Sequence, residues 1–129
     1  MATLISATGS NLLTQTSAAE DTLVGTSGTD TLISAFASTD MYGLQGNDFL
    51  IVLGATDVFA FGGQGNDSLT AASSGGKNAL FGDKGNDTVV GGAVGSDSLY
   101  GGDGADTIIA GLKSLGFGNA GNDSLFGSG

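Results

Sequence analysis

Residues 62–70 read Gly-Gly-Gln-Gly-Asn-Asp-Ser-Leu-Thr, and residues 101–109 read Gly-Gly-Asp-Gly-Ala-Asp-Thr-Ile-Ile. Both stretches carry two glycines three positions apart, an aspartate two positions after the second glycine, and an aliphatic residue two positions after the aspartate. A repeat of about 20 residues is typical of solenoids, in which each repeat forms one stacked unit. The recurrence of this spacing therefore predicts a solenoid fold.

The pattern Gly-x-x-Gly-x-Asp-x-aliphatic occurs six times in the chain. The first glycines are Gly25, Gly43, Gly62, Gly82, Gly101 and Gly118, and the second are Gly28, Gly46, Gly65, Gly85, Gly104 and Gly121. The aspartates are Asp30, Asp48, Asp67, Asp87, Asp106 and Asp123. The aliphatic residues are Leu32, Leu50, Leu69, Val89, Ile108 and Leu125. A single Gly-x-Asp is usually an ordinary Asx turn, but six copies in one register indicate a repeating site.

A weaker column lies about half a period away from the aspartates. It places an apolar residue two positions after each of Asp21, Asp40, Asp57, Asn78, Asp97 and Lys113. Short strands and turns therefore alternate twice per coil. The acids Asp40, Asp57 and Asp97 are either ligands of a second row of ions or ordinary solvated turns, and both interpretations stay open.

The composition excludes several classes of protein. Of 129 residues 25 are glycine, and proline, cysteine and histidine are absent. Thirteen acids against three lysines give a net charge of -10, which excludes a nucleic-acid-binding face. Without cysteine there is no disulfide or thiolate site. The chain also shows no apolar run long enough for a transmembrane segment and no cleavable signal peptide. Lacking histidine, cysteine and any nucleophile beside a base, it is not expected to be an enzyme.

The repeats resemble the calcium-binding nonapeptide repeats of the repeats-in-toxin (RTX) family, Gly-Gly-x-Gly-x-Asp-x-aliphatic-x. Residues 62–70 and 101–109 match in full, while the other copies lack only the second glycine of the opening pair. The resemblance implies an all-β fold, and we predict a right-handed parallel β-roll of six to seven coils. One departure is that every second half-turn is eroded, as in the repeat regions of RTX adhesins.

Calcium chemistry fits the motif without the resemblance. Ca²⁺ takes six to eight oxygen ligands, and one such turn offers only a carboxylate and backbone carbonyls. Two stacked turns supply more, so each ion is expected to lie between neighbouring coils. The six motifs then predict about five Ca²⁺ ions, with the six aspartates and the twelve motif glycines as ligand positions. Because stacked aspartates repel and the apolar columns are thin, the chain is expected to be marginal without calcium.

Residues 1–17 keep the apolar rhythm at Leu4 and Leu13 but carry no acid, so they read as a degenerate coil that serves as a cap or docking segment. Residues 18–129 form the calcium-binding solenoid. Tyr42, Phe59 and Phe61 are expected to be core fillers or cap-like stacks, as is Phe81.

We expect a structural protein that binds itself head to tail and propagates as a filament or a surface layer. The resemblance implies secretion to the extracellular space or cell surface by the type I route. The alternatives are a spacer of an RTX adhesin, an ice-binding module, and the C-terminal repeat domain of a secreted enzyme.

Overall fold

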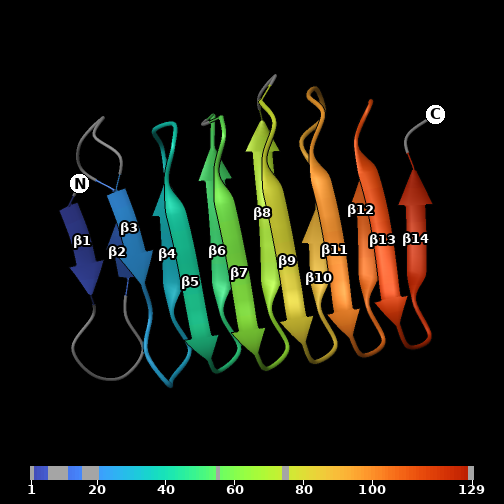
Figure 1. Ribbon diagram of the computed structural model, residues 1–129, viewed down its shortest axis with the longest axis horizontal. Helices are drawn as coiled ribbons and strands as arrows, with labels where there is room; N and C mark the ends of the chain where they lie inside the picture. The colour runs from blue at the N-terminus through green and yellow to red at the C-terminus, as the bar shows by residue number, and fades with distance from the viewer. Residues whose placement is uncertain (1, 6–11, 16–20, 55, 74–75, 128–129) are drawn as a thin grey trace.

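The computed structural model describes residues 2–5, 12–15, 21–54, 56–73 and 76–127, and in them the chain is all β. Two seven-stranded parallel sheets face each other, and the chain alternates between them at every strand (Figure 1). No helix long and apolar enough to cross a membrane occurs in this part of the chain. The prediction of a parallel β-solenoid is confirmed.

The odd-numbered sheet contains the first strand of each coil. Its strands are β1 (Ala2–Ile5), β3 (Asp21–Val24), β5 (Asp40–Gln45), β7 (Phe59–Gln64), β9 (Ala79–Lys84), β11 (Ser98–Asp103) and β13 (Leu115–Ala120). The even-numbered sheet contains the second strand of each coil. Its strands are β2 (Leu12–Thr14), β4 (Thr31–Ser34), β6 (Phe49–Leu53), β8 (Ser68–Ser73), β10 (Thr88–Val90), β12 (Thr107–Ala110) and β14 (Ser124–Gly127).

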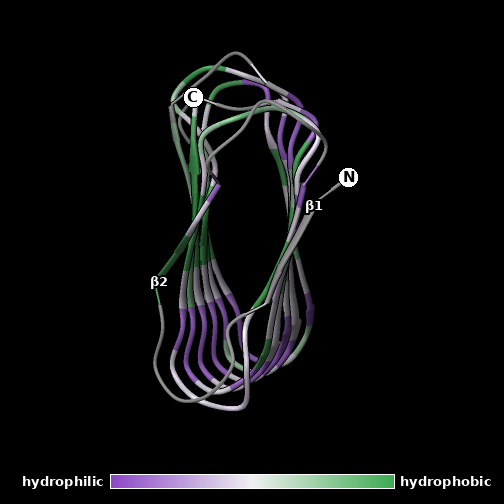
Figure 2. Cartoon of the chain, turned by 90° about the vertical axis from the view of Figure 1, so that its left-hand side faces the viewer, coloured by the Kyte–Doolittle hydropathy of each residue, from purple (hydrophilic) through white to green (hydrophobic). Residues whose placement is uncertain are grey.

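The core is one narrow layer between the two sheets, which Figure 2 shows end-on. Strand residues alternate between the two faces of a sheet, so each strand sends only one or two side chains inward. The even-numbered sheet contributes the motif aliphatics, of which Leu32, Leu50 and Leu69 are fully buried. The odd-numbered sheet contributes a matching row that includes Leu23 and Met41. Among the six motif aliphatics only Leu125, in the last described coil, is exposed (52%).

The two edges of the solenoid differ in regularity (Figure 1). The aspartate edge consists of residues 25–30 and the turns 46–48, 65–67, 85–87, 104–106 and 121–123. Its last five turns all have three residues. The opposite edge consists of residues 35–39, 54–58, 74–78, 91–97 and 111–114, so its connections vary from four to seven residues. Only the aspartate edge therefore repeats the same backbone in coil after coil.

The aromatic residues lie outside the core, contrary to the expectation that they fill it. Tyr42 pairs in register with Phe61, and Phe61 pairs with Phe81, on the outer face of the odd-numbered sheet. These rings are half-buried, and Phe59 is 49% exposed. The physical reason is the alternation of faces: Met41 and Ala60 take the inward positions next to these rings, so the rings point outward. Tyr42, Phe61 and Phe81 do form a stack, but it runs along the outer face of the sheet and does not include Phe59.

Candidate metal centre

The aspartate edge is built on backbone conformations that require glycine. Gly65 has a φ of +132°, and a Cβ placed on it would overlap the carbonyl oxygen of Gly46 in the preceding coil. An L-residue avoids both the positive φ and this close approach, so the second glycine of the motif lets successive turns nest. The second glycines at 46, 85, 104 and 121 share the same conformation.

The motif aspartates form a continuous hydrogen-bonded ladder along this edge. The backbone N–H of Asp48 donates to Oδ1 of Asp67 at 2.8 Å, and the N–H of Asp67 donates to Oδ1 of Asp87 at 2.7 Å. The same bond joins Asp30 to Asp48, Asp87 to Asp106 and Asp106 to Asp123. Each carboxylate is therefore held by the coil that precedes it.

The second carboxylate oxygen has no partner in the four internal coils. Oδ2 of Asp48, Asp67, Asp87 and Asp106 is buried without any hydrogen bond. A buried carboxylate oxygen without a donor is costly unless a cation or a proton neutralises it. Burial, the largest cause, raises the pKa of Asp67 from 3.8 to about 7, and those of Asp48 and Asp87 to about 6. These oxygens are therefore atoms that a bound cation would stabilise.

Each of these unpaired Oδ2 atoms faces a small space beside the first glycine of its own motif. We call this space, which lies between the Oδ2 atom and a backbone carbonyl of the next coil, a cradle. A Cβ placed on Gly43 would lie 2.5 Å from Oδ2 of Asp48 and 2.5 Å from the carbonyl oxygen of Gly62 in the next coil. A Cβ on Gly62 would meet Oδ2 of Asp67 and the Gly82 carbonyl in the same way. Five such cradles lie between successive coils, beside Gly25, Gly43, Gly62, Gly82 and Gly101.

The donors around a cradle fit Ca²⁺. They are a carboxylate oxygen from one coil and a backbone carbonyl from the next, and both are hard oxygen ligands of the type that calcium prefers. Within the described ranges no three acidic residues gather as a metal-binding cluster, because the ladder places one carboxylate in each coil. The motif therefore distributes its charge along a row instead of concentrating it at one point.

The predicted glycine ligands fall into two groups. The carbonyls of the first glycines Gly43, Gly62, Gly82, Gly101 and Gly118 lie at the cradles. The carbonyls of Gly28, Gly46, Gly65, Gly85 and Gly104 instead lie against the second glycine of the following coil. The geometry therefore favours the first glycines as ligands and gives the second glycines a packing role.

The two ends of the row differ from its middle. Oδ2 of Asp30 accepts hydrogen bonds from the backbone N–H of Thr26 at 2.5 Å and from its hydroxyl at 2.9 Å. Asp123 is only partly buried because no described coil follows it. Sequence reasoning overlooked Thr26, although it is the only threonine directly after a first glycine of the motif.

A second ladder, of asparagines, runs parallel to the aspartates. The backbone N–H of Asn66 donates to Oδ1 of Asn47 at 2.8 Å, and Asn86 donates to Oδ1 of Asn66. Ala105 continues the row by donating to Asn86. The signal was visible in the sequence, since Gly-Asn-Asp recurs in four of the six motifs.

The opposite edge does not form a second row of acids. Register pairs Asp40 with Phe59 on the outer face, and Asp57 is exposed. The inward position that corresponds to the aspartates is occupied by Asp21, Thr39, Val58, Asn78 and Asp97. The alignment that placed Asp40 and Asp57 in one column with Asp97 was therefore wrong by one residue.

Asp97 itself is buried, but the protein already satisfies both of its carboxylate oxygens. Oδ1 accepts from the backbone N–H of Asn78 at 3.0 Å and from its side-chain amide at 3.1 Å, and Oδ2 accepts from Gly92 at 2.9 Å. A carboxylate with this many donors needs no metal. The geometry therefore favours the structural interpretation of Asp97 over a second ion row.

Comparison with known families agrees with this site. The model of a family described as RTX calcium-binding nonapeptide repeat (4 copies) matches residues 16–50, 42–74, 72–93, 94–112 and 117–129. All six motifs fall inside these ranges. No curated protein and no solved structure matches the chain.

Proposed function

Because the chain belongs to the RTX calcium-binding nonapeptide-repeat family, we propose that it is an extracellular structural solenoid that folds on Ca²⁺ and stacks end to end. The repeats of this family are structural elements that bind Ca²⁺. The observation that carries the proposal is the row of buried Oδ2 atoms that lack a hydrogen-bond partner. Catalysis has no part in this function.

Each of the four cradles with an unpaired Oδ2 would hold one ion between two coils. The cradle beside Gly25, where Oδ2 of Asp30 already accepts two hydrogen bonds from Thr26, would hold a fifth ion more weakly. The Asp67 carboxylate and the Gly82 carbonyl would hold one of them, and the bound ion supplies positive charge that offsets the buried carboxylates. The ion also ties each coil to the next, so binding and folding occur together. At low calcium the neighbouring aspartates repel one another and the thin core leaves the chain marginal.

The proposed dependence on calcium supports an extracellular location. RTX repeats are typical of proteins secreted by the type I route. A chain that is unfolded at the low calcium of the cytosol and folds at the higher calcium outside the cell suits such export. The net charge of -10 favours the unfolded chain until the ions bind.

Stacking is supported by the last described coil. Leu115, Leu125 and Phe126 there are 60%, 52% and 58% exposed, and β13 and β14 are the outer strands of their sheets. The other end of both sheets is formed by β1 and β2, which belong to the proposed docking segment 1–17. Residues 1, 6–11 and 16–17 of that segment lie outside the described residues.

All strands within each sheet are parallel, so β13 and β14 of one copy present the edge that β1 and β2 of the next can extend. Such a contact is heterologous and does not close, so it propagates as a filament. Unpaired strand edges with exposed apolar side chains are the usual starting point for this association.

Calcium titration with circular dichroism and light scattering tests the proposal. We expect a reversible coil-to-β transition followed by growth of the particles. Deletion of residues 1–17 and Leu125→Asp, at the exposed end, should abolish growth but leave the transition. Leu112→Asp is the matched control, since this side chain is 46% exposed but lies on the opposite edge. A chain equally folded in excess chelator would overturn the calcium part, and strict monomers at high protein and millimolar calcium would overturn stacking.

A further inference from the structure

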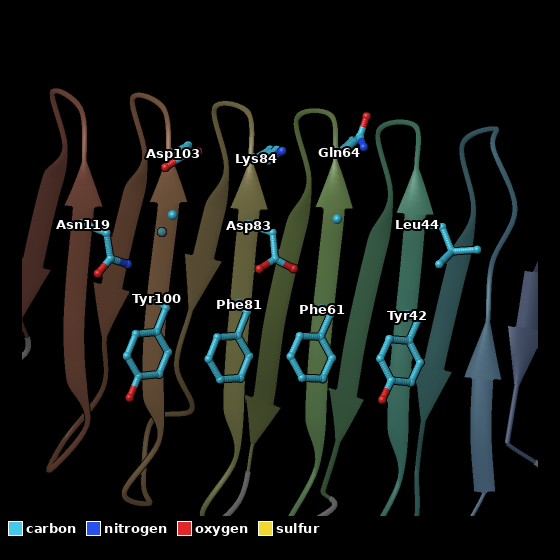
Figure 3. A pocket seen from close by; sticks show the side chains of 13 residues that line it. Tyr42, Leu44, Phe61, Gln64, Phe81, Asp83, Lys84, Tyr100, Asp103 and Asn119 are labelled. Carbon is cyan, nitrogen blue, oxygen red and sulfur yellow. The ribbon is translucent and has the colours of Figure 1, made fainter.

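A row of aromatic rings follows the outer face of the odd-numbered sheet and belongs to no part of the metal row. Tyr42, Phe61, Phe81, Tyr100 and Phe117 come from five successive strands, with ring centroids 4.7–5.1 Å apart and planes within 11° of parallel. Figure 3 shows four of these rings side by side across the strands. The chain thus carries a continuous apolar strip that runs along the solenoid axis.

A groove of about 670 Å³ lies beside this strip. Its far side carries Gln64, Lys84 and Asp103, close to the turns of the aspartate edge (Figure 3). An aromatic wall opposite a few polar groups is the usual composition of a binding site. The groove is open and elongated, so it suits a chain-like ligand better than a compact one.

At the middle of the groove, residues with and without a side chain alternate from coil to coil. The paired positions are Leu44, Gly63, Asp83, Gly102 and Asn119, so every second coil lacks a side chain. All five have positive φ, and a Cβ on Gly63 or Gly102 would overlap the backbone of the preceding coil. Two open positions, over Gly63 and Gly102, therefore recur at a spacing of two coils, about 9.6 Å for strands about 4.8 Å apart.

The charged and polar side chains of the groove indicate the kind of ligand that it binds. Asp83, Lys84 and Asp103 carry mixed signs, and Gln64 and Asn119 supply neutral amides. Hydroxyl groups both donate and accept hydrogen bonds, so they match such a mixed surface. The net charge of -10 disfavours an anionic polymer, and Lys84 offsets one of the two acids so that the groove itself carries little net charge.

From these features we infer that the groove binds an uncharged, extended polysaccharide of the β-1,4-linked type. The apolar faces of its sugars lie against the aromatic row, and their hydroxyl groups meet Gln64, Asp83 and Asp103. Successive sugars in such a chain alternate in orientation, so the same face returns at every second unit. This period matches the two-coil spacing of Gly63 and Gly102.

Titration with cellohexaose in the presence of calcium tests the inference. Tyr42 and Tyr100 are the two tyrosines of the chain, which has no tryptophan, so tyrosine emission reports on this groove. We expect the hexasaccharide to change this emission and to release heat in calorimetry. Polygalacturonate, an anionic polymer, should bind at least about tenfold more weakly.

Variants separate binding from stability. The double variant Gln64→Ala and Asp103→Ala lies outside the ring stack, so it should keep the fold but weaken cellohexaose about tenfold. Phe81→Ala should weaken it further. Phe49→Ala is the matched control, because this 50% exposed ring lies in the other sheet, and it should bind like the wild type.

Three results would overturn the inference: no binding at millimolar hexasaccharide, equal weakening by Phe49→Ala, or equal affinity for polygalacturonate. Sheet-to-sheet dimers that block the titration would instead assign this face to a second copy of the chain. None of these outcomes depends on stacking end to end, because the groove lies on a side of the solenoid and not at its ends.

Discussion

The two edges of the solenoid connect the same two sheets, but they differ in how many oxygens of a buried carboxylate accept a hydrogen bond. At the aspartate edge, Asp67 uses one oxygen for a hydrogen bond and leaves the other without a partner. At the opposite edge, Asp97 accepts hydrogen bonds at both oxygens. The corresponding glycines, each five residues earlier, are Gly62 and Gly92.

The difference lies in where the backbone N–H groups point. Gly92 donates its N–H to Oδ2 of Asp97. Beside Gly62, in contrast, Oδ2 of Asp67 lies near the carbonyl oxygen of Gly82. Two oxygens facing each other repel unless a cation lies between them, while an N–H and an oxygen attract directly. Under the proposed function, the same residue type at equivalent positions is thus a metal ligand at one edge and a structural acceptor at the other.

Substitution of the two aspartates by alanine is expected to have the largest effects, and the effects should differ in their dependence on calcium. Asp67→Ala removes a carboxylate from the ion row and leaves the buried N–H of Asp48 unpaired, so the calcium midpoint of folding should rise severalfold. Asp97→Ala leaves the N–H groups of Asn78 and Gly92 without an acceptor, which costs about 2 kcal/mol of unfolding free energy with or without calcium.

Urea unfolding at saturating and at low calcium measures both effects. The expected signature is a calcium-dependent loss for Asp67→Ala and a calcium-independent loss for Asp97→Ala. A loss of bound Ca²⁺ from the folded Asp97→Ala protein would show that the opposite edge also holds ions.

Substitution of Gly62 and of Gly92 by alanine tests the same difference between the edges and leaves both carboxylates in place. In Gly62→Ala the new methyl group would overlap Oδ2 of Asp67 and lie 2.7 Å from the Gly82 carbonyl, so one ion should be lost from the measured stoichiometry. In Gly92→Ala the nearest atoms are 3.4 Å away, which is ordinary contact. This variant should change stability by less than about 1 kcal/mol.

Equilibrium dialysis with radioactive calcium counts the ions in each variant. Unchanged stoichiometry in a folded Gly62→Ala protein would contradict the placement of calcium in the cradles. A lower count in Gly92→Ala would contradict the structural role of Asp97.

The smallest expected effect is that of pH on the calcium-free chain. Burial raises the pKa of Asp67 in the folded chain from 3.8 to about 7, so its protonated form stabilises the fold. That contribution is complete below about pH 4 and is lost as the pH rises to about 7. With chelator present, circular dichroism should therefore show more residual β structure at pH 5 than at pH 8.

With calcium bound the dependence reverses, because protons compete with the ion for the carboxylates. Asp67→Asn should flatten the pH dependence in chelator, because it removes the carboxyl group whose pKa is raised. A calcium-free chain that is more stable at pH 8 than at pH 5 would contradict the raised pKa values.

The sequence by itself determined the repeat, the strands and the buried row. Glycines at a fixed spacing define turns that only glycine tolerates, and the aliphatic residue two positions after each aspartate must lie on the inner face. Leu50, Leu69 and Val89 are accordingly fully buried. A motif of fixed length leaves the chain no freedom to shift, so this edge could be predicted residue by residue.

Only the tertiary structure decided the opposite edge and the outer face. The connections there vary from four to seven residues, and a shift of one residue moves every following side chain to the other face. That shift puts Asp40 outside, Met41 inside and Tyr42 in the aromatic row. Which carboxylate keeps an unpaired oxygen was equally beyond the sequence, because it depends on whether the residue's own turn directs an N–H to Oδ2, as Gly92 does for Asp97 but no residue does for Asp67.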